Sequence, residues 1–253
     1  MTGIGPGAFE LWWARDGAIR EFIRDAHSLY VETLAELGVV GLALLAVALA
    51  LMLGLGAAGA LRKGPVARRA VAAGATAGVA AFAAGASVNW SWEISVLPML
   101  ALLLAAVALA AGRPEAAAPP QRRPLPRAAT AIVAVIAIGL IAIPLAATGA
   151  LRDSQAEARV GDLPTALHRA DQARRLQPYA ATPRLQRALV LERAGALDGA
   201  ARSIAEAVRR SPQDWRLWLV RSRIEAKRDH AEASVTAYRR ARSLNPRSRL
   251  FAR

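Results

Sequence analysis

His27 is the side chain in this sequence with the clearest chemical potential. It lies in the segment DAHSLYVETLAELGVVGLALL, residues 25–45, which runs into a long apolar stretch. An imidazole with a pKa of about 6.5 can accept a proton at neutral pH, which is the chemistry of a general base. The 253 residues contain only three histidines and no cysteine, so disulfides, thiolate nucleophiles and cysteine-ligated metals are excluded. We expect neither a metal nor a cofactor.

Other catalytic patterns are missing. No GxSxG, no GxGxxG after a strand and no GxxxxGK[ST] occurs, which excludes the usual serine hydrolase, dinucleotide and P-loop motifs. The segment GIGPGAF, residues 3–9, is rich in glycine, but no lysine or strand follows it. Its glycines are expected to form turns near a substrate or a membrane. His168 and His230 are expected to be ordinary surface residues.

A helix must position His27. Asp25 is a suitable N-cap, because its carboxylate can accept the free N–H groups of a first helical turn. One face would then carry residues at helical spacing, namely His27, Tyr30, Val31 and Leu34. The two acids of the segment, Glu32 and Glu36, would share another face. Gly38 and Gly41 mark the entry to the apolar stretch, so His27 is expected one or two turns outside a bilayer.

Four apolar stretches are predicted to cross a membrane, since a helix needs roughly 20 apolar residues to span the hydrocarbon core. They are residues 39–60, 70–88, 94–111 and 128–150, so three spans fall within 39–111. The second is only weakly hydrophobic, but its alanines and glycines suit close helix packing. The N-terminal GIGPGAFELWW has no basic region before an apolar core, so a cleaved signal peptide is not expected.

Loop charges predict the orientation of these spans. The 61–69 loop carries four positive charges and no acid, and the Pro/Arg linker 112–127 carries four arginines against one acid. Because Lys and Arg are enriched in cytoplasmic loops, both segments are expected in the cytoplasm. Residues 1–38 and 151–253 would then lie on the extracytoplasmic side of the plasma (inner) membrane, with the NWSWE turn, residues 89–93, at the outer interface.

The C-terminal part is basic and repetitive. Residues 151–253 contribute +11 to the net charge of +14, whereas residues 1–150 contribute +3. Residue types recur every 34 positions in several registers, namely Pro178, Pro212 and Pro246; Ala173, Ala207 and Ala241; Gly161, Gly195 and Asp229; and Ala166, Ala200 and Ser234. This period resembles the tetratricopeptide repeat (TPR), in which two helices form each unit. Trp218 and Tyr238 match its aromatic positions. Arg184, 34 residues before Trp218, is the equivalent residue of the preceding repeat and does not match the aromatic pattern.

About three such repeats, over 153–246, would form an α-solenoid, so the fold class is all-α: four membrane helices followed by TPR-like repeats at 151–253. A stack of this kind binds proteins or peptides in its groove. The basic surface would suit an acidic partner, anionic lipid headgroups or an acidic glycan, or it is simply a solvated helix surface. Nucleic acid is not expected, because no aromatic residues interleave with the basic ones.

The N-terminal motifs resemble the C-terminal part of the O-antigen ligase and Wzy-type polymerase family of membrane glycosyltransferases. The residues that carry the first element are Gly3, Gly5, Gly7 and Phe9. The second element is matched by Ala26, His27, Tyr30, Glu32, Glu36, Gly38 and Gly41, with Ser28 where Asn is more usual. The stretch SVNWSWEISVLP, residues 87–98, is similar to a later helix hairpin of the family, and several members end in TPR units.

The resemblance implies transfer of a glycan from a polyprenyl-diphosphate carrier to an acceptor hydroxyl, with His27 as the general base. Arg15, Arg20 and Arg24 are local candidates for contact with the diphosphate. The family has more membrane helices than the four expected here, so this chain would represent a fragment, and we expect it to be inactive in isolation. The alternative is a membrane-anchored, non-enzymatic TPR scaffold that recruits envelope proteins.

Overall fold

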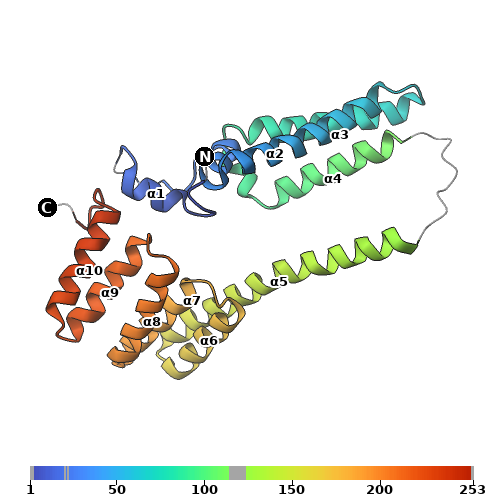
Figure 1. The fold of residues 1–253 in the computed structure, drawn as a ribbon. Helices are drawn as coiled ribbons and strands as arrows, with labels where there is room; N and C mark the ends of the chain where they lie inside the picture. Colours follow the sequence, from blue (N-terminus) through green and yellow to red (C-terminus); the bar gives the residue numbers. More distant parts are fainter. Residues whose placement is uncertain (1–2, 20, 22, 114–123, 252–253) are drawn as a thin grey trace. The chain divides into compact units, whose positions relative to one another are not determined.

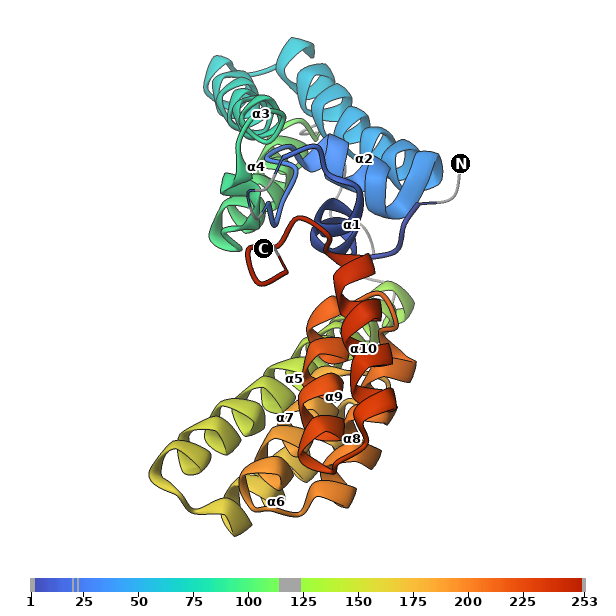
Figure 2. The same ribbon diagram turned by 90° about the vertical axis from the view of Figure 1, so that its left-hand side faces the viewer.

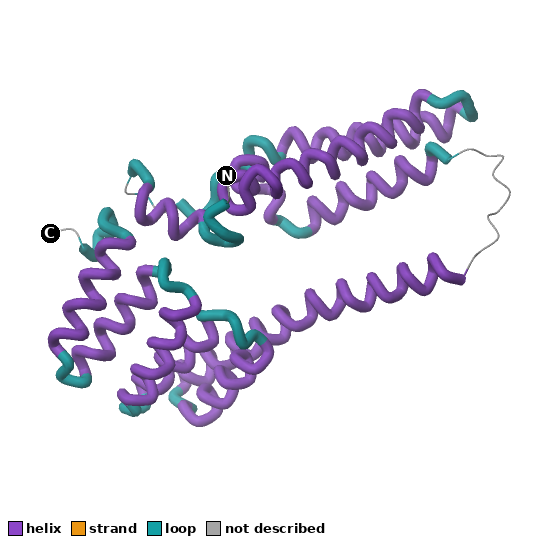
Figure 3. Tube along the Cα trace, viewed as in Figure 1, coloured by secondary structure: helices purple, strands orange, loops and turns teal. Residues whose placement is uncertain are grey.

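The computed structural model describes residues 3–19, 21, 23–113 and 124–251, and within them every regular element is a helix (Figures 1 and 3). The predicted all-α class is therefore confirmed for the described residues. The chain divides into an N-terminal unit, Met1–Pro120, and a C-terminal unit, Gln121–Arg253.

The N-terminal unit is built on three long helices that pack against one another. Its elements are α1 (Phe9–Asp16), α2 (Leu29–Leu61), α3 (Val66–Gly85), the 3₁₀ helix η1 (Trp90–Glu93) and α4 (Val96–Ala111). The buried positions of α3 lie on one face at helical spacing: Ala72, Ala75, Val79 and Ala83. These small side chains let the neighbouring backbones approach closely, as the alanine-rich composition of this segment predicts.

The helix that follows His27 begins later than predicted. Ser28, not Asp25, is the N-cap of α2, and its Oγ accepts a hydrogen bond from the Val31 N–H at 3.4 Å. His27 precedes the helix in a left-handed conformation with φ 55°, so it does not share a helical face with Tyr30 and the residues after it. A serine hydroxyl directly before the first turn is the better-placed acceptor, which is why Asp25 is displaced from that role.

A second departure is at Gly38, which interrupts α2 with φ 70° and ψ −167°. This conformation is accessible to glycine and costly for other residues. The helix therefore changes direction where the first predicted span, 39–60, begins. The residues before the kink, from Leu29 onward, form helix, as the helical spacing of Tyr30, Val31 and Leu34 predicts.

The C-terminal unit is a succession of helices, each packed against the next. They are α5 (Pro124–Val160), α6 (Leu163–Leu176), α7 (Thr182–Arg193), α8 (Leu197–Arg210), α9 (Trp215–Lys227) and α10 (Ala231–Leu244). Figure 2 shows α8, α9 and α10 side by side. α5 continues without a break through residues 150 and 151, where the sequence predicts the end of the fourth span and the start of the repeats. The predicted linker 112–127 ends in helix from Pro124 onward, and its residues 114–123 lie outside the described residues.

The 34-residue period of the sequence is also a period of the structure. The helices α6, α8 and α10 begin at residues 163, 197 and 231 and each contains 14 residues. The turn before each one contains a residue with positive φ, namely Gly161, Gly195 and Asp229. The alanines of one register, Ala173, Ala207 and Ala241, are all 0% exposed. Small residues are required there because the helices approach closely at these points.

Arg184 and Trp218 are equivalent positions with different side chains and similar contacts. The Trp218 Nε1–H donates to the Pro212 carbonyl at 2.9 Å. The Arg184 Nη1–H donates to the Ala180 carbonyl at 2.8 Å, and its Nε–H donates to Glu206 at 3.3 Å. Each side chain thus connects its own helix, α7 for Arg184 and α9 for Trp218, to the loop that precedes that helix. The arginine is tolerated in this buried position because its charge is paired.

Candidate functional site

The glycine-rich N-terminal segment and the segment after His27 are joined by the carboxylate of Glu36. The Gly7 N–H donates to Oε2 at 2.8 Å, and the Phe9 N–H donates to Oε1 at 3.1 Å. Phe9 is the first residue of α1, which has no other side-chain cap. A carboxylate at this position satisfies free N–H groups at the start of the helix and complements its dipole. We call this arrangement the Glu36 clasp.

Backbone hydrogen bonds extend the clasp. The Ile4 N–H donates to the Ala35 carbonyl at 2.9 Å, and the Gly5 N–H donates to the Glu36 carbonyl at 3.0 Å. A Cβ on Gly3 would collide with the Glu36 carbonyl group, so no larger residue fits there. Gly5 and Gly7 have positive φ, of 107° and 66°, which glycine adopts without steric cost.

The predicted motif residues Gly3, Gly5, Gly7, Glu36 and Gly38 are therefore brought together, and their contacts are structural. Gly41 lies one turn beyond the kink, where a Cβ would collide with the side chain of Leu37. Tyr30 lies on the other side of α2, where its hydroxyl donates to the Ala83 carbonyl at 2.9 Å. These contacts hold the start of α2 between the N-terminal segment and the end of α3.

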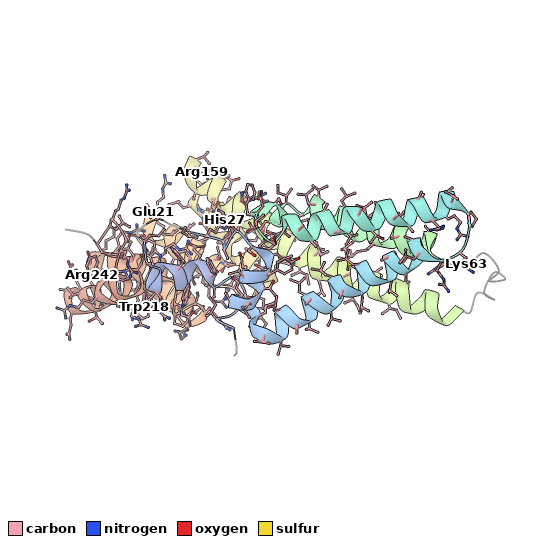
Figure 4. All side chains as sticks on the ribbon, turned by 90° about the horizontal axis from the view of Figure 1, so that it is seen from above. Glu21, His27, Lys63, Arg159, Trp218 and Arg242 are labelled. Atoms are coloured by element: carbon pink, nitrogen blue, oxygen red, sulfur yellow. The ribbon has the colours of Figure 1, made fainter. Side chains whose placement is uncertain are left out.

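His27 is exposed, and one of its ring nitrogens is occupied. Its Nδ1 lies 3.0 Å from the Asp25 carbonyl oxygen. A carbonyl oxygen can only accept, so this contact assigns the proton to Nδ1 and leaves the Nε2 lone pair free. This is the tautomer that a general base acting through Nε2 requires. Figure 4 shows His27 and Lys63 at opposite ends of the helices of the N-terminal unit.

Three carboxylates gather beside His27. Oxygen atoms of Asp25, Glu32 and Glu93 lie within 4.8 Å of one another. Glu32 also accepts a hydrogen bond from the Ala26 N–H at 3.0 Å. Glu93 is the last residue of η1. The segment that leads into η1 is attached to the start of α2, because the Leu29 N–H donates to the Ala86 carbonyl at 2.9 Å. The hairpin between α3 and α4 therefore contributes an acid to the surroundings of His27.

Glu93 lies close to the charged groups of this cluster. Desolvation and a hydrogen bond with Asp25 raise the pKa of Glu93 above its ordinary value, and the nearby charge of Arg24 opposes the shift. The carboxyl groups of Asp25 and Glu93 therefore lie close to each other. Carboxylate oxygens are the ligands that hard cations such as Ca²⁺ and Mg²⁺ prefer, so these three residues are the described ones with the donor set for such an ion.

The structure describes two of the three candidate arginines. Arg15 lies at the end of α1, where it forms an ion pair with Asp16 at 2.9 Å. Arg24 is exposed and lies near Glu93. Arg20 lies outside the described residues. Arg24 is therefore the candidate whose place near the His27 cluster is known.

Sequence reasoning missed the Asp25–Glu93 pair and the clasp. A signal for the pair existed, since the topology inferred from loop charge places residues 1–38 and the 89–93 turn on the same side of the membrane. The contact between Asp25 and Glu93 depends on how the helices pack, and no local sequence pattern indicates it. Comparison of the chain with protein-family models and with curated proteins gives no match.

Proposed function

We propose that this chain takes part in glycan transfer from a polyprenyl-diphosphate carrier to an acceptor hydroxyl, with His27 as the general base. The observation that carries the proposal is the hydrogen bond from His27 to the Asp25 carbonyl. It orients the imidazole and leaves Nε2 free at an exposed position beside carboxylates. The resemblance of the surrounding motif to the O-antigen ligase and Wzy-type polymerase family supports the same role.

Membrane placement is supported by the surfaces of two helices. Among the described residues, Leu29–Leu61 and Ala134–Val160 are long and apolar enough to cross a bilayer, with mean hydropathies of 2.6 and 2.3. Only 6% and 11% of their most apolar windows are buried within the chain, whereas a core helix of a soluble protein buries most of its apolar face. Lipid is the environment that would cover this surface.

We further propose that α3 and α4 cross beside α2, which makes four spans with α5. The 16 residues of α4 extend roughly 24 Å at 1.5 Å per residue, so residues 94–95 would lengthen the span and η1 would stay at the outer interface. The His27 segment and the C-terminal repeats would then lie on the extracytoplasmic side of the plasma membrane. Those repeats would form a TPR solenoid.

In the proposed reaction, Nε2 of His27 takes the proton of the acceptor hydroxyl. The hydroxyl oxygen bonds to the anomeric carbon of the glycan, and the bond from that carbon to the diphosphate oxygen breaks. The polyprenyl diphosphate leaves with the electron pair. Asp25 and Glu32 would stabilise the imidazolium that forms. Arg24 would neutralise part of the charge of the leaving group, and this scheme requires no metal.

The test is a substitution of His27 in the cells that produce this protein, with surface glycan measured by gel and mass spectrometry. His27→Gln should lower transfer by about 10²–10⁴-fold, the usual contribution of a general base. His168→Gln, at an exposed histidine of the repeats, is the matched control and should leave the glycan unchanged. Normal glycan in the His27→Gln cells, with the protein present at normal amounts, would overturn the proposal.

A second candidate function is a membrane-anchored scaffold that recruits an envelope protein through the repeats. The observation that favours it is the exact recurrence of α6, α8 and α10 at 34-residue intervals, since stacked helical repeats commonly present a binding surface. Capture of interacting proteins by the full chain separates the two functions. The scaffold predicts that His27→Gln changes neither the captured proteins nor the surface glycan.

A further inference from the structure

A basic cavity lies at the end of the N-terminal unit that is remote from His27. Its volume is about 380 Å³, and it opens between the end of α2, the start of α3 and the end of α4. Five cationic side chains line it: Arg62, Lys63, Arg68, Arg69 and Arg113. The side chain of Lys63 is labelled at this end of the helices in Figure 4. We call this site the basic cavity.

Backbone atoms hold the helix ends together around the cavity. Gly59 of α2 and Gly112, directly after α4, are in close contact, and a Cβ added to Gly59 would lie 2.8 Å from the Gly112 Cα. Both glycines line the cavity. Because neither has a side chain, the ends of α2 and α4 approach closely and form one wall of the cavity.

Two of the arginines are held in place. The Arg68 Nη2–H donates to the Arg113 carbonyl at 2.8 Å, and the Arg69 Nε–H donates to the Ala60 carbonyl at 3.0 Å. Each bond uses one of the five N–H donors of a guanidinium group and leaves the others available. The cations are thus partly preorganised, which lowers the entropy cost of binding an anion.

Within the described residues of the N-terminal unit, no carboxylate balances the charge of the basic cavity. Within the described residues, Arg62, Lys63 and Arg113 are exposed and form no ion pair. The one acid between residues 37 and 113 is Glu93, which lies beyond the far end of α3. α3 starts at the rim with Pro65 as its N-cap and has no side-chain cap, so its first N–H groups add positive potential.

Apolar side chains lie next to these cations. Leu61 and Val66 are 80% and 79% exposed, and they flank the basic segment between α2 and α3. An amphipathic ligand with an anionic head and an apolar tail would contact both surfaces. Free inorganic phosphate would contact only the cations.

We propose that the basic cavity binds the phosphate group of an anionic membrane lipid, with the acyl chains along the exposed apolar surface near Leu61 and Val66. Basic pockets between membrane helices bind such headgroups in other proteins. The proposal rests on the membrane placement given above, but it requires neither glycan transfer nor His27. The lipid would also fix the depth of the helix ends in the bilayer.

The experiment uses the full chain in detergent, titrated with phosphatidylglycerol or phosphatidylcholine and analysed by native mass spectrometry. The test variant, Arg62→Gln with Lys63→Gln and Arg113→Gln, leaves the bonds of Arg68 and Arg69 in place. The matched control, Arg239→Gln with Arg240→Gln and Arg242→Gln, removes three exposed charges from α10. Parallel titrations contain inorganic phosphate in place of the lipid. Co-flotation of each protein with phosphatidylcholine vesicles checks that it inserts into a membrane.

We expect the unaltered chain and the α10 control to retain phosphatidylglycerol in preference to phosphatidylcholine, and the cavity variant to bind it about 10- to 100-fold more weakly. Equal losses in both variants would overturn the proposal, since bulk charge would then explain the binding. Retention of inorganic phosphate without retention of the lipid would overturn the lipid assignment. Failure of flotation by every variant would instead refute the membrane placement, whereas normal flotation without lipid preference refutes the basic cavity alone.

Discussion

Glu36 has a structural role although it lies in the motif that carries the catalytic candidate. Its two carboxylate oxygens accept from the Gly7 and Phe9 N–H groups, and both contacts span more than twenty residues of sequence. Charged acceptors form stronger hydrogen bonds than neutral ones. The clasp therefore fixes the N-terminal segment against the start of α2, a few residues from His27.

Replacement of Glu36 by glutamine should loosen this segment. Glu36→Gln leaves one oxygen and places an amide NH₂ against an N–H donor, which costs about 1–3 kcal/mol locally. The amides of Gly7 and Phe9 should then exchange hydrogen roughly tenfold faster or more, since about 1.4 kcal/mol corresponds to a factor of ten. Glu21→Gln, at an exposed acid of the same segment, is the control. Unchanged exchange in Glu36→Gln would mean that the clasp does not hold the segment.

Helix packing in the N-terminal unit depends on specific glycines. Gly59 meets the Gly112 backbone, so Gly59→Ala would push α2 and α4 apart and destabilise the bundle by about 1–3 kcal/mol. Gly54 lies on the same helix with nothing within 4 Å of an added Cβ. Gly54→Ala should be neutral or stabilising by up to about 1 kcal/mol, because alanine favours helix. Thermal unfolding of both variants in one detergent measures the difference, and equal midpoints would contradict the packing argument.

A charge network joins α7 to α9. The Glu192 carboxylate is 5% exposed and accepts from Arg223 at 2.9 and 2.7 Å, and Lys227 lies 2.9 Å away. Burial raises the pKa of Glu192, but the hydrogen bonds from Arg223 and Lys227 outweigh it and lower the pKa below its ordinary value. A depressed folded-state pKa stabilises the fold above the unfolded-state pKa of about 4.3, and this stabilisation is lost as the pH falls through the folded-state value.

Glu192→Gln should therefore destabilise the C-terminal unit at pH 7 by about 2 kcal/mol, and the difference from the unaltered chain should shrink as the solution is acidified below about pH 4. Unfolding followed by circular dichroism across this range makes the measurement. Glu232→Gln, at an exposed acid of α10, provides the comparison and should change neither stability nor its pH dependence. A constant difference at all pH values would show that packing, not charge, accounts for the effect.

Over the chain as a whole, patterns with a fixed period were the most predictable. The 34-residue register predicted the helix order of the C-terminal unit, because each repeat position has the same packing demand, as Ala173 and Ala207 show. The start of α2 was predicted three residues too early, because Asp25 and Ser28 are both suitable N-cap residues. The meeting of Asp25 with Glu93 was missed because it joins segments far apart in sequence. Local patterns contain no information on such contacts.

The placement of the C-terminal unit depends on whether α5 crosses a membrane, and two exposed apolar residues on this helix separate the possibilities. Leu140 is 70% exposed and Val160 is 80% exposed, so an arginine at either would be tolerated in water. In a bilayer, an arginine at the helix centre costs about 2.5–3.5 kcal/mol, and one at the end costs far less. We expect Leu140→Arg to block insertion and Val160→Arg to permit it. The cysteine-free chain allows a single Gln213→Cys, at an exposed residue, to report the outcome. A membrane-impermeant maleimide applied to intact cells should label it in the Val160→Arg background and not in the Leu140→Arg background, and equal labelling of both would show that α5 does not span the membrane.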